Sequence, residues 1–298
     1  MSLQFLLDGV IAGSMIGLGA IGVTLTYSIL RFSNFAHGDF MAWGAYAALA
    51  VVGALGGSTA LKPLSFGLPL LVALVVAMAL TALLALVLDW LLFARLRARG
   101  QSIIVVMASF GASMALRSLL EFIFTSRPTY FSRAIQMATP LGLGIKITAD
   151  QVALLLLTLV LVVGMHLFMA HSQRGREMRA YSQNPALAKV VGIDVAAVVR
   201  ATWVIGAALA CASGVMVGVL VQIRPLMGLS LLLPMFAAAI LGGIGSVRGA
   251  LLGGLIIGLS EAAAVQFVGA EWRQAVAFVI LMAVLLIRPI GLFGVAER

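Results

Sequence analysis

Long apolar stretches, separated by short polar ones, follow one another along the whole chain. A helix that spans a membrane needs about 20 consecutive, mainly apolar residues. Stretches near this length cover residues 5–29, 39–56, 67–93, 102–120, 150–170, 201–222, 229–247, 249–268 and 273–288. This pattern predicts an all-α integral membrane protein, a polytopic bundle of about 8–10 transmembrane or re-entrant helices. The stretch after Arg31 and the one ending at Gly243 are the candidates for re-entrant segments.

The polar stretches are too short to form a second domain. The two longest, residues 121–149 and 171–200, hold about thirty residues each, which is fewer than an independent hydrophobic core needs. We therefore expect one transmembrane domain over residues 1–298. The opening "MSLQFLLDGVIAGSMIG" has no Lys or Arg before its apolar run, so we expect the first span to be retained rather than cleaved as a signal peptide.

The composition supports a bilayer rather than water as the solvent. The chain is 63% hydrophobic and 10% charged, whereas a soluble domain is about 25% charged. The net charge of +9 raises the possibility of nucleic-acid binding, but the placement of the charges argues against it. If the spans alternate, twelve Lys and Arg (positions 31, 95–99, 174–200, 248, 288 and 298) lie on one side and six (62, 127–146, 224 and 273) on the other, with Arg117 inside a span. The positive-inside rule then predicts that the first side, with the C-terminus, is cytoplasmic.

Glycine is abundant and is spaced for helix packing. The chain has 32 glycines, and a four-residue spacing places them on one helix face, where two backbones can approach closely. We expect this packing role for Gly9, Gly13, Gly17, Gly242, Gly243, Gly245, Gly249 and Gly253. The single cysteine, Cys211, is expected to be a small buried apolar residue.

The polar segment 171–200 contains a short helix with strong start and stop signals. Asn184 is a favoured N-cap, Pro185 suits the first helical position, and Gly192 suits a left-handed helix end. Between them, Leu187, Val190 and Val191 share one face. So short a helix is marginal in water, so this face must dock. It lies either on lipid head groups, with Arg174, Arg176 and Arg179 near anionic lipid, or on a cytoplasmic partner.

Three blocks resemble one known family. "RAYSQNPALAKVVGIDV" (179–195), "RFSNFAHGDFMAWGAY" (31–46) and "FAAAILGGIGSVRGALLGGLIIGLSEA" (236–262) resemble the LivH-type permease subunits of branched-chain amino acid ABC importers. The resemblance implies a bacterial inner-membrane permease. Its partners would be a second, related permease, two ATP-binding cassette subunits and a periplasmic binding protein. It also implies that the 185–191 helix couples to an ATPase subunit, through Arg179, Asn184, Pro185, Leu187, Val190, Val191 and Gly192.

The sequence itself lacks the means to bind ATP in a P-loop. That motif needs a lysine directly after a glycine, and none of Lys62, Lys146 and Lys189 follows one. We therefore expect no cofactor on this chain and ATP on the partner subunits. No metal-ligand or catalytic spacing involves His37, His166, His171 or Cys211, so we expect a transport subunit rather than an enzyme.

Polar residues inside the apolar stretches are candidate functional residues, because such residues are costly to place in a membrane. Candidates for a pathway or gate are Asn34, His37, Asp39, Ser14, Thr26, Ser109 and Ser113. The alternative is that Ser33, Asn34 and Asp39 cap helix ends at a tight turn; a proton relay through His37 and Asp39 is a third hypothesis. We expect Arg117 and Glu261 to lie near outer span ends, where they pair or reach the interface, and His166 to be interfacial. Asp89 is expected to pair with Arg95 or Arg97.

The span centres are almost free of charged residues, and two expectations follow from this. It argues against a self-sufficient secondary transporter or channel, the main alternative, because such proteins keep charged groups near the midplane. It also favours a solute without net charge. Together with the resemblance this predicts leucine, isoleucine or valine as the substrate, with other amino acids, short amides or urea as alternatives.

Overall fold

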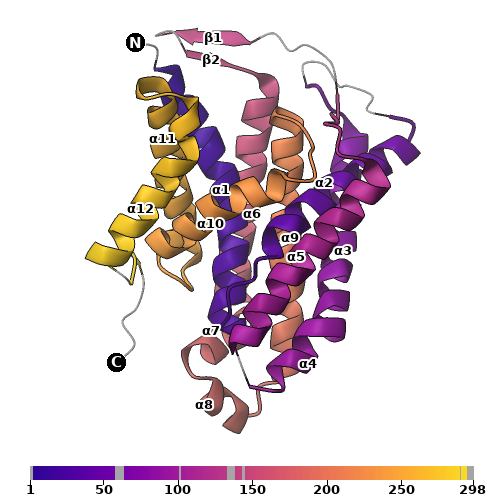
Figure 1. Ribbon diagram of the computed structural model, residues 1–298, viewed down its shortest axis with the longest axis vertical. Coiled ribbons are helices and arrows are strands. Elements are labelled where there is room, and N and C mark those ends of the chain that lie inside the picture. The colour runs from indigo at the N-terminus through magenta and orange to yellow at the C-terminus, as the bar shows by residue number, and fades with distance from the viewer. Residues whose placement is uncertain are drawn as a thin grey trace.

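The computed structural model describes residues 3–57, 64–100, 102–132, 138–142, 145–288 and 290–293. In these ranges the chain is almost entirely helical (Figure 1). The elements are α1 (Gln4–Leu30), α2 (His37–Ala54), α3 (Leu68–Leu88), a π-helical turn η1 (Asp89–Phe93), α4 (Ala94–Arg97), α5 (Ser102–Phe124), β1 (Thr139–Gly142), β2 (Ile145–Ile147), α6 (Ala149–His171), α7 (Gln173–Gln183), α8 (Pro185–Val190), α9 (Val195–Leu220), α10 (Met227–Gly242), α11 (Val247–Phe267), η2 (Ala270–Trp272) and α12 (Arg273–Ile287).

Each of the nine predicted apolar stretches forms a helix, so the all-α polytopic fold is confirmed. Among the described residues, seven helical stretches are long and apolar enough to cross a membrane: α1, α3 continued through α4, α5, α6, α9, α11, and α12 with η2. The other two, α2 and α10, are the stretches that the sequence marked as re-entrant candidates. Helix α10 has only 16 residues, and α2 carries the polar His37 and Asp39 in its first turn.

Local capping explains where the observed boundaries differ from the predicted ones. Helix α9 begins at Val195 rather than near 201, because the Asp194 side chain accepts a hydrogen bond from the N–H of Ala197 at 3.1 Å. Helix α10 ends at Gly242 rather than near 247, because Gly243 (φ 95°) and Gly245 (φ 91°) leave the helical region of the backbone. Side-chain caps and glycines with positive φ thus set helix boundaries that hydropathy alone does not reveal.

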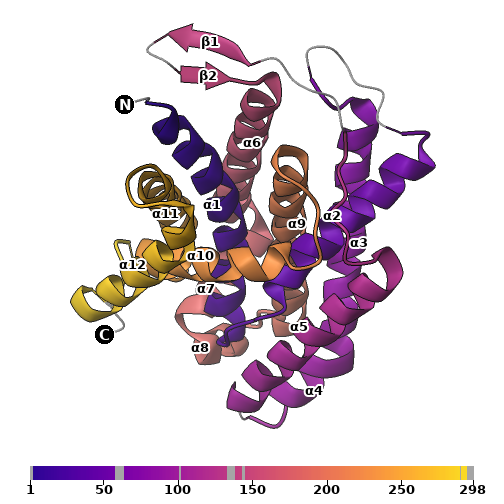
Figure 2. The same cartoon turned by 45° about the horizontal axis from the view of Figure 1, so that its top comes forward.

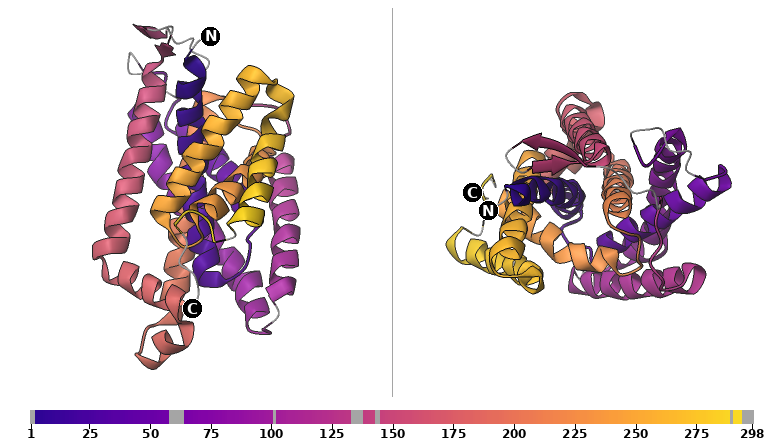
Figure 3. Two further views of the ribbon diagram at one scale, coloured as in Figure 1. Left: turned by 90° about the vertical axis from the view of Figure 1, so that its left-hand side faces the viewer. Right: turned by 90° about the horizontal axis from the view of Figure 1, so that it is seen from above.

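Helices α1 and α9 form the centre of the molecule, and the remaining helices surround them. Seen from above in Figure 3, α6, α11, α12, α5 and α3 lie around this central pair. Helix α1 packs against α11, α9 and α10, and α9 packs against α2 and α3. The outer helices keep large apolar side chains exposed, among them Val160 on α6 and Phe122 on α5. Such an apolar exterior suits a lipid-facing surface.

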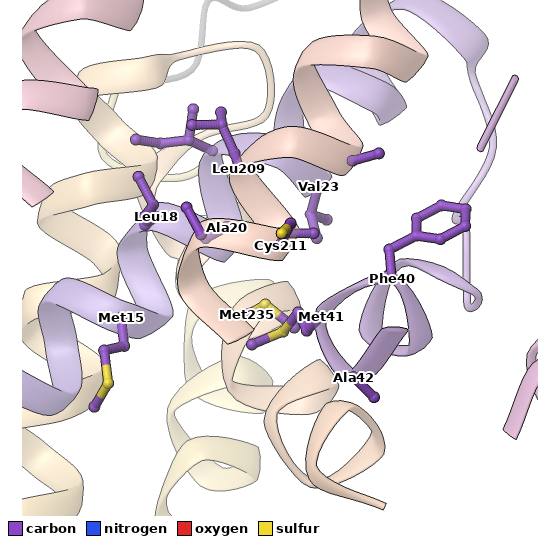
Figure 4. Packing of buried hydrophobic residues seen from close by; sticks show 14 of the residues in the cluster. Met15, Leu18, Ala20, Val23, Phe40, Met41, Ala42, Leu209, Cys211 and Met235 are labelled. Carbon is purple, nitrogen blue, oxygen red and sulfur yellow. The ribbon is translucent and has the colours of Figure 1, made fainter. Parts of the chain in front are cut away.

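The core between α1, α2, α9 and α10 is filled by small and sulfur-containing side chains. Figure 4 shows Met41 of α2, Cys211 of α9 and Met235 of α10 close to one another near α1. All three are fully buried. Cys211 contacts the backbone position of Gly44 on α2, which confirms the expectation of a small buried apolar residue.

Glycines bring α1 and α11 into backbone contact, in keeping with the close-packing role expected of them. The Cα of Gly13 lies so near Leu255 that an added Cβ would sit 2.7 Å from its Cα, and Gly9 faces Leu259 in the same way at 2.9 Å. Gly17 meets Gly254, while Gly249 and Gly253 lie against α10 at Gly242 and Ala238. The packing prediction was wrong for Gly243 and Gly245: both lie in the turn before α11, where their positive φ is what requires glycine.

The end of the molecule near the N-terminus is closed by a small hairpin. Strands β1 and β2 pair in antiparallel fashion and lie over the end of α6, as Figure 2 shows. The Gln4 side chain bonds both backbone groups of Lys146, donating to its carbonyl at 3.1 Å and accepting from its N–H at 2.8 Å. A capping box between Thr148 and Gln151 then starts α6. The stretch 121–149 thus packs onto the bundle, in the parts that are described.

The contact between α1 and α11 generates a packing prediction. Gly13→Ala should lower the thermal stability of the detergent-purified protein, because the new methyl group meets backbone atoms of α11 that cannot move aside. Overpacking of this kind costs about 1–3 kcal/mol. Gly164→Ala on α6 is the matched control, since nothing lies within 4 Å of its added Cβ. Thermal unfolding curves that fall equally for both variants, or for neither, would contradict close glycine packing at Gly13.

Candidate translocation and coupling sites

The segment between α1 and α2 turns the chain back into the molecule. Helix α1 ends at Arg31, whose left-handed φ of 58° is unusual for a residue other than glycine. The Asn34 side chain then accepts a hydrogen bond from the N–H of Ala36 at 3.1 Å, and the N–H of Phe35 donates to Oγ of Ser109 at 3.2 Å. This Asn34 contact closes the turn before α2 but does not cap the helix, whose N-cap is Ala36 without a side-chain hydrogen bond. Nδ2 of Asn34 is buried without a hydrogen-bond partner among the described residues.

His37 and Asp39 engage different helices. The Nε2 of His37 lies 3.2 Å from the carbonyl oxygen of Gly19 on α1. Asp39 instead points to α5, where its carboxylate accepts a hydrogen bond from the Ser113 hydroxyl. No hydrogen bond among the described residues joins His37 to Asp39, so the geometry gives no direct path for a proton relay between them.

Asp39 also pairs with Arg117, and this pairing was not predicted from the sequence. Nε and Nη2 of Arg117 both lie 3.3 Å from Oδ1 of Asp39, and Nη2 lies 3.1 Å from Oγ of Ser113. Arg117 is the sixteenth of the 23 residues of α5, so seven residues of the helix follow it. The expected pairing of Arg117 with Glu261 was therefore wrong, since each of the two pairs with another residue. The expected interfacial position of Arg117 and the expectation of almost charge-free span centres stay predictions.

The remaining charged groups near the helices find closer partners. Glu261 pairs with Arg273 at 2.8 Å, where α12 begins beside α11. Asp89 pairs with Arg97 at 2.7 Å, one of the two predicted partners. His166 lies 2.9 Å from Arg248 at the start of α11. The Glu261 and His166 contacts join neighbouring helices, whereas Asp89 and Arg97 belong to one continuous helical stretch.

The other pathway candidates are mostly satisfied within their own helices. Ser14 donates to the carbonyl oxygen of Ile11 at 2.7 Å, and Thr26 to that of Gly22 at 2.8 Å. Ser109, by contrast, bridges α5 to the turn before α2. The structure thus brings Asn34, Asp39, Ser109 and Ser113 together around the start of α2 and leaves Ser14 and Thr26 on α1. Whether these residues line a pathway stays a prediction.

Two aromatic clusters also surround the start of α2. Phe35 contacts Phe110 of α5 and Phe236 of α10, with ring centroids 6.0 and 5.8 Å apart. On the other side, Trp203 of α9 stacks on Phe93 at 5.2 Å. The sequence could not reveal these clusters, because their members come from segments far apart along the chain and carry no spacing signal.

Helices α7 and α8 project from the end opposite the N-terminus, as Figure 1 shows. Asn184 accepts a hydrogen bond from the N–H of Leu187 at 3.0 Å, and Gly192 has φ 84°, so both predicted helix signals are confirmed. Ala188 is buried and anchors α8, while Leu187, Val190 and Val191 are 57%, 83% and 66% exposed. The predicted apolar face exists and is uncovered in this chain.

Basic side chains on α7 hold the turn from α6. Arg176 donates to the carbonyl oxygen of His171 at 2.8 Å, and Arg179 lies 3.5 Å from that of Ala170. Arg31, at the end of α1, donates to the carbonyl oxygen of Ser182 at 2.6 Å. The projection is therefore fixed to two neighbouring helices. In the part of the chain that is described, no three His, Cys, Asp or Glu side chains gather as metal ligands would.

Comparison with known proteins gives a family match over almost the whole chain. Residues 5–285 match the family model described as the branched-chain amino acid transport system permease component. The chain is 31% identical to the high-affinity branched-chain amino acid transport system permease protein LivH of Escherichia coli K12 and 32% identical to BraD of Pseudomonas aeruginosa. Each alignment covers 99% of this chain and 96% of the relative.

A solved structure has the same fold. PsaBC from Streptococcus pneumoniae, in complex with a Fab, superimposes with a TM-score of 0.52 over 96% of this chain and 93% of that one, at 14% sequence identity. At this identity the likeness concerns the fold alone. The family match, the two close relatives and the seven apolar helices agree with one another: the chain is a multi-pass membrane protein and belongs to the permease components of branched-chain amino acid transport systems.

Proposed function

We propose that the chain is the membrane-spanning subunit of an ATP-driven ABC importer and forms part of the path for a branched-chain amino acid. A second, related permease would supply the rest of the path, two ATP-binding cassette subunits the energy, and a periplasmic binding protein the substrate. The names of the relatives, which concern branched-chain amino acid transport, support the substrate class. Other amino acids, short amides and urea are the alternatives.

The observation that carries the proposal is the exposed apolar face of α8. Leu187 and Val190 lie on this six-residue helix, Val191 directly follows it, and all three side chains are exposed. Full burial of each on docking would contribute roughly 1.5–3 kcal/mol. The helix is nevertheless capped at both ends, so its shape is set before anything docks. An exposed apolar face of preformed shape suits insertion into a groove of an ATPase subunit.

Basic residues at the same end support the proposed orientation. Arg174, Arg176, Arg179 and Lys189 all belong to α7 and α8, and the C-terminal helix α12 also runs toward this end of the molecule (Figure 3). By the positive-inside rule this end faces the cytoplasm of a bacterial inner membrane, where ATP is available.

The ion pair of Asp39 and Arg117 favours a second candidate, a self-sufficient secondary transporter. Charged groups inside the membrane-spanning region are typical of that class. The exposed face of α8 favours the importer, because a transporter that works alone has no need of a cytoplasmic docking helix. Dependence on ATP separates the two.

A topology measurement tests the orientation. A reporter inserted at Ser182 or fused after Arg298 should be cytoplasmic, and one inserted near Ser132 should be periplasmic. Paired alkaline phosphatase and fluorescent-protein fusions at each site measure this directly. Phosphatase activity at Ser182 would place α8 outside the cell and would rule out contact with an ATPase.

An uptake experiment tests the function. The complex should be purified with its partner subunits, reconstituted in liposomes and supplied with its binding protein. ATP-dependent uptake of leucine, isoleucine or valine is expected, with little uptake of phosphate, a dicarboxylate or a polyamine. Uptake by this chain alone without ATP would support the secondary transporter, and preferred uptake of urea or acetamide would identify the amide alternative.

A substitution on α8 tests the docking face. Leu187→Asp should abolish co-purification of the ATPase subunits, because it removes an apolar contact and adds an unpaired charge, a loss of about 2 kcal/mol or more. Lys189→Asp, on the opposite side of the same short helix, is the control and should retain them. A helix that merely lies on anionic lipid would show the reverse order, with Lys189→Asp the more damaging change.

A further inference from the structure

The ion pair of Asp39 and Arg117 is longer than the pairs of Arg97 with Asp89 and of Arg273 with Glu261. Both of its nitrogen–oxygen distances are 3.3 Å, whereas the pairs of Arg97 with Asp89 and Arg273 with Glu261, which also end on one carboxylate oxygen, measure 2.7 and 2.8 Å. Short distances and a two-oxygen fork are the mark of a fully engaged Arg–carboxylate pair. Nη1 of Arg117 has no hydrogen bond to any described residue, so the guanidinium keeps donors in reserve.

The pair lies in the interior of the molecule. His37, two residues before Asp39, lies against Gly19 and Gly22, past the midpoint of the 27-residue α1. The Asp39 side chain is 1% exposed and that of Arg117 15%. Burial of two charges seldom stabilises a fold by more than apolar packing would, and charged groups in membrane spans commonly mark a substrate path. We therefore expect this ion pair to have a role other than stabilising the fold.

An exposed apolar stripe leads away from the pair along α5. Phe110, Met114 and Arg117 are spaced i, i+4 and i+7 and so share one helix face. Phe110 and Met114 are 51% and 55% exposed, and Phe110 continues into the cluster with Phe35 and Phe236. The stripe runs toward the end of the molecule where α7 and α8 lie (Figure 1). A charged pair with an apolar surface beside it is complementary to an aliphatic amino acid, which has a charged head group and an apolar side chain.

We propose that Asp39, Ser113 and Arg117 bind the zwitterionic head group of the transported amino acid. Its ammonium group lies on the Asp39 carboxylate, its carboxylate on Nη1 and Nη2 of Arg117, and its aliphatic side chain on Met114 and Phe110. The pair is neutral as a whole, and so is a zwitterion, so binding leaves no net charge in the interior. This assignment rests on the proposed function, since it requires an amino acid as the solute.

An introduced cysteine tests the head-group site. Met114→Cys places a thiol beside the pair, and the native Cys211 is buried and offers little background. In the reconstituted complex, leucine should slow labelling by a neutral maleimide at least fivefold. 4-Methylpentanoic acid, which lacks the ammonium group, and 3-methylbutylamine, which lacks the carboxylate, should not. Val160→Cys, exposed on α6, is the control and should label at the same rate with or without leucine.

Substitution of the arginine separates a binding role from a structural one. Arg117→Gln in the Met114→Cys background should remove protection by leucine and, in the native background, lower uptake per ATP hydrolysed at least tenfold. Arg97→Gln, which also breaks an ion pair between helical segments, should keep both. If Arg117→Gln lowers only the yield or thermal stability while protection persists, the pair is structural and the proposal fails.

The ligand series decides the matter even if Arg117→Gln does not assemble. Equal protection by leucine and by the two single-charge analogues, or none by leucine, overturns head-group recognition. Protection by urea or acetamide instead of leucine overturns it as well. Absence of ATP-dependent leucine uptake by the unaltered complex would instead refute the proposed function, so the two failures are distinguishable.

Discussion

Direct contact between backbones at glycine is the interaction on which the rest of this structure depends. Gly38 at the start of α2 and Gly228 at the start of α10 face each other so closely that neither position has room for a Cβ. Gly214 of α9 meets the backbone of Met41 in the same way. In a membrane, where helices gain little from apolar burial alone, such close approach maximises packing and lets two short helices remain inside the bundle.

The short helices in turn create the polar centre. Because α2 starts in the interior, its first turn presents Asp39 to the middle of α5 rather than to a membrane surface. The backbone groups of the turn before it are satisfied by Asn34 and Ser109, as an irregular segment at this depth requires. A continuous spanning helix would have carried Asp39 to the interface, where its pairing with Arg117 would have no consequence for a solute.

The sequence predicted the elements well and their partners poorly. Apolar length gave nine helices, and the chemistry of Asn184, Pro185 and Gly192 gave α8 with its caps, because both signals are local. Arg117 was given the wrong partner because hydropathy locates a residue along its own helix but does not say which helix begins beside it. Gly245 was misassigned because its four-residue spacing to Gly249 continues across a helix start that only the Ser246 cap marks. Gly243 was misassigned because it directly follows the last residue of α10.

A chain of contacts connects the exposed helix α8 to the polar centre. Helix α8 follows α7, and the carbonyl oxygen of Ser182 near the end of α7 accepts a hydrogen bond of 2.6 Å from Arg31. Arg31 begins the turn that leads through Asn34 to α2 and hence to Asp39. The turn is only a few residues long and is fixed to α5 at Ser109, so it cannot absorb a displacement of α7 by stretching. A rigid movement of α7 and α8 would therefore be passed to the start of α2, and the loosest ion pair between the helices is the contact that would change first.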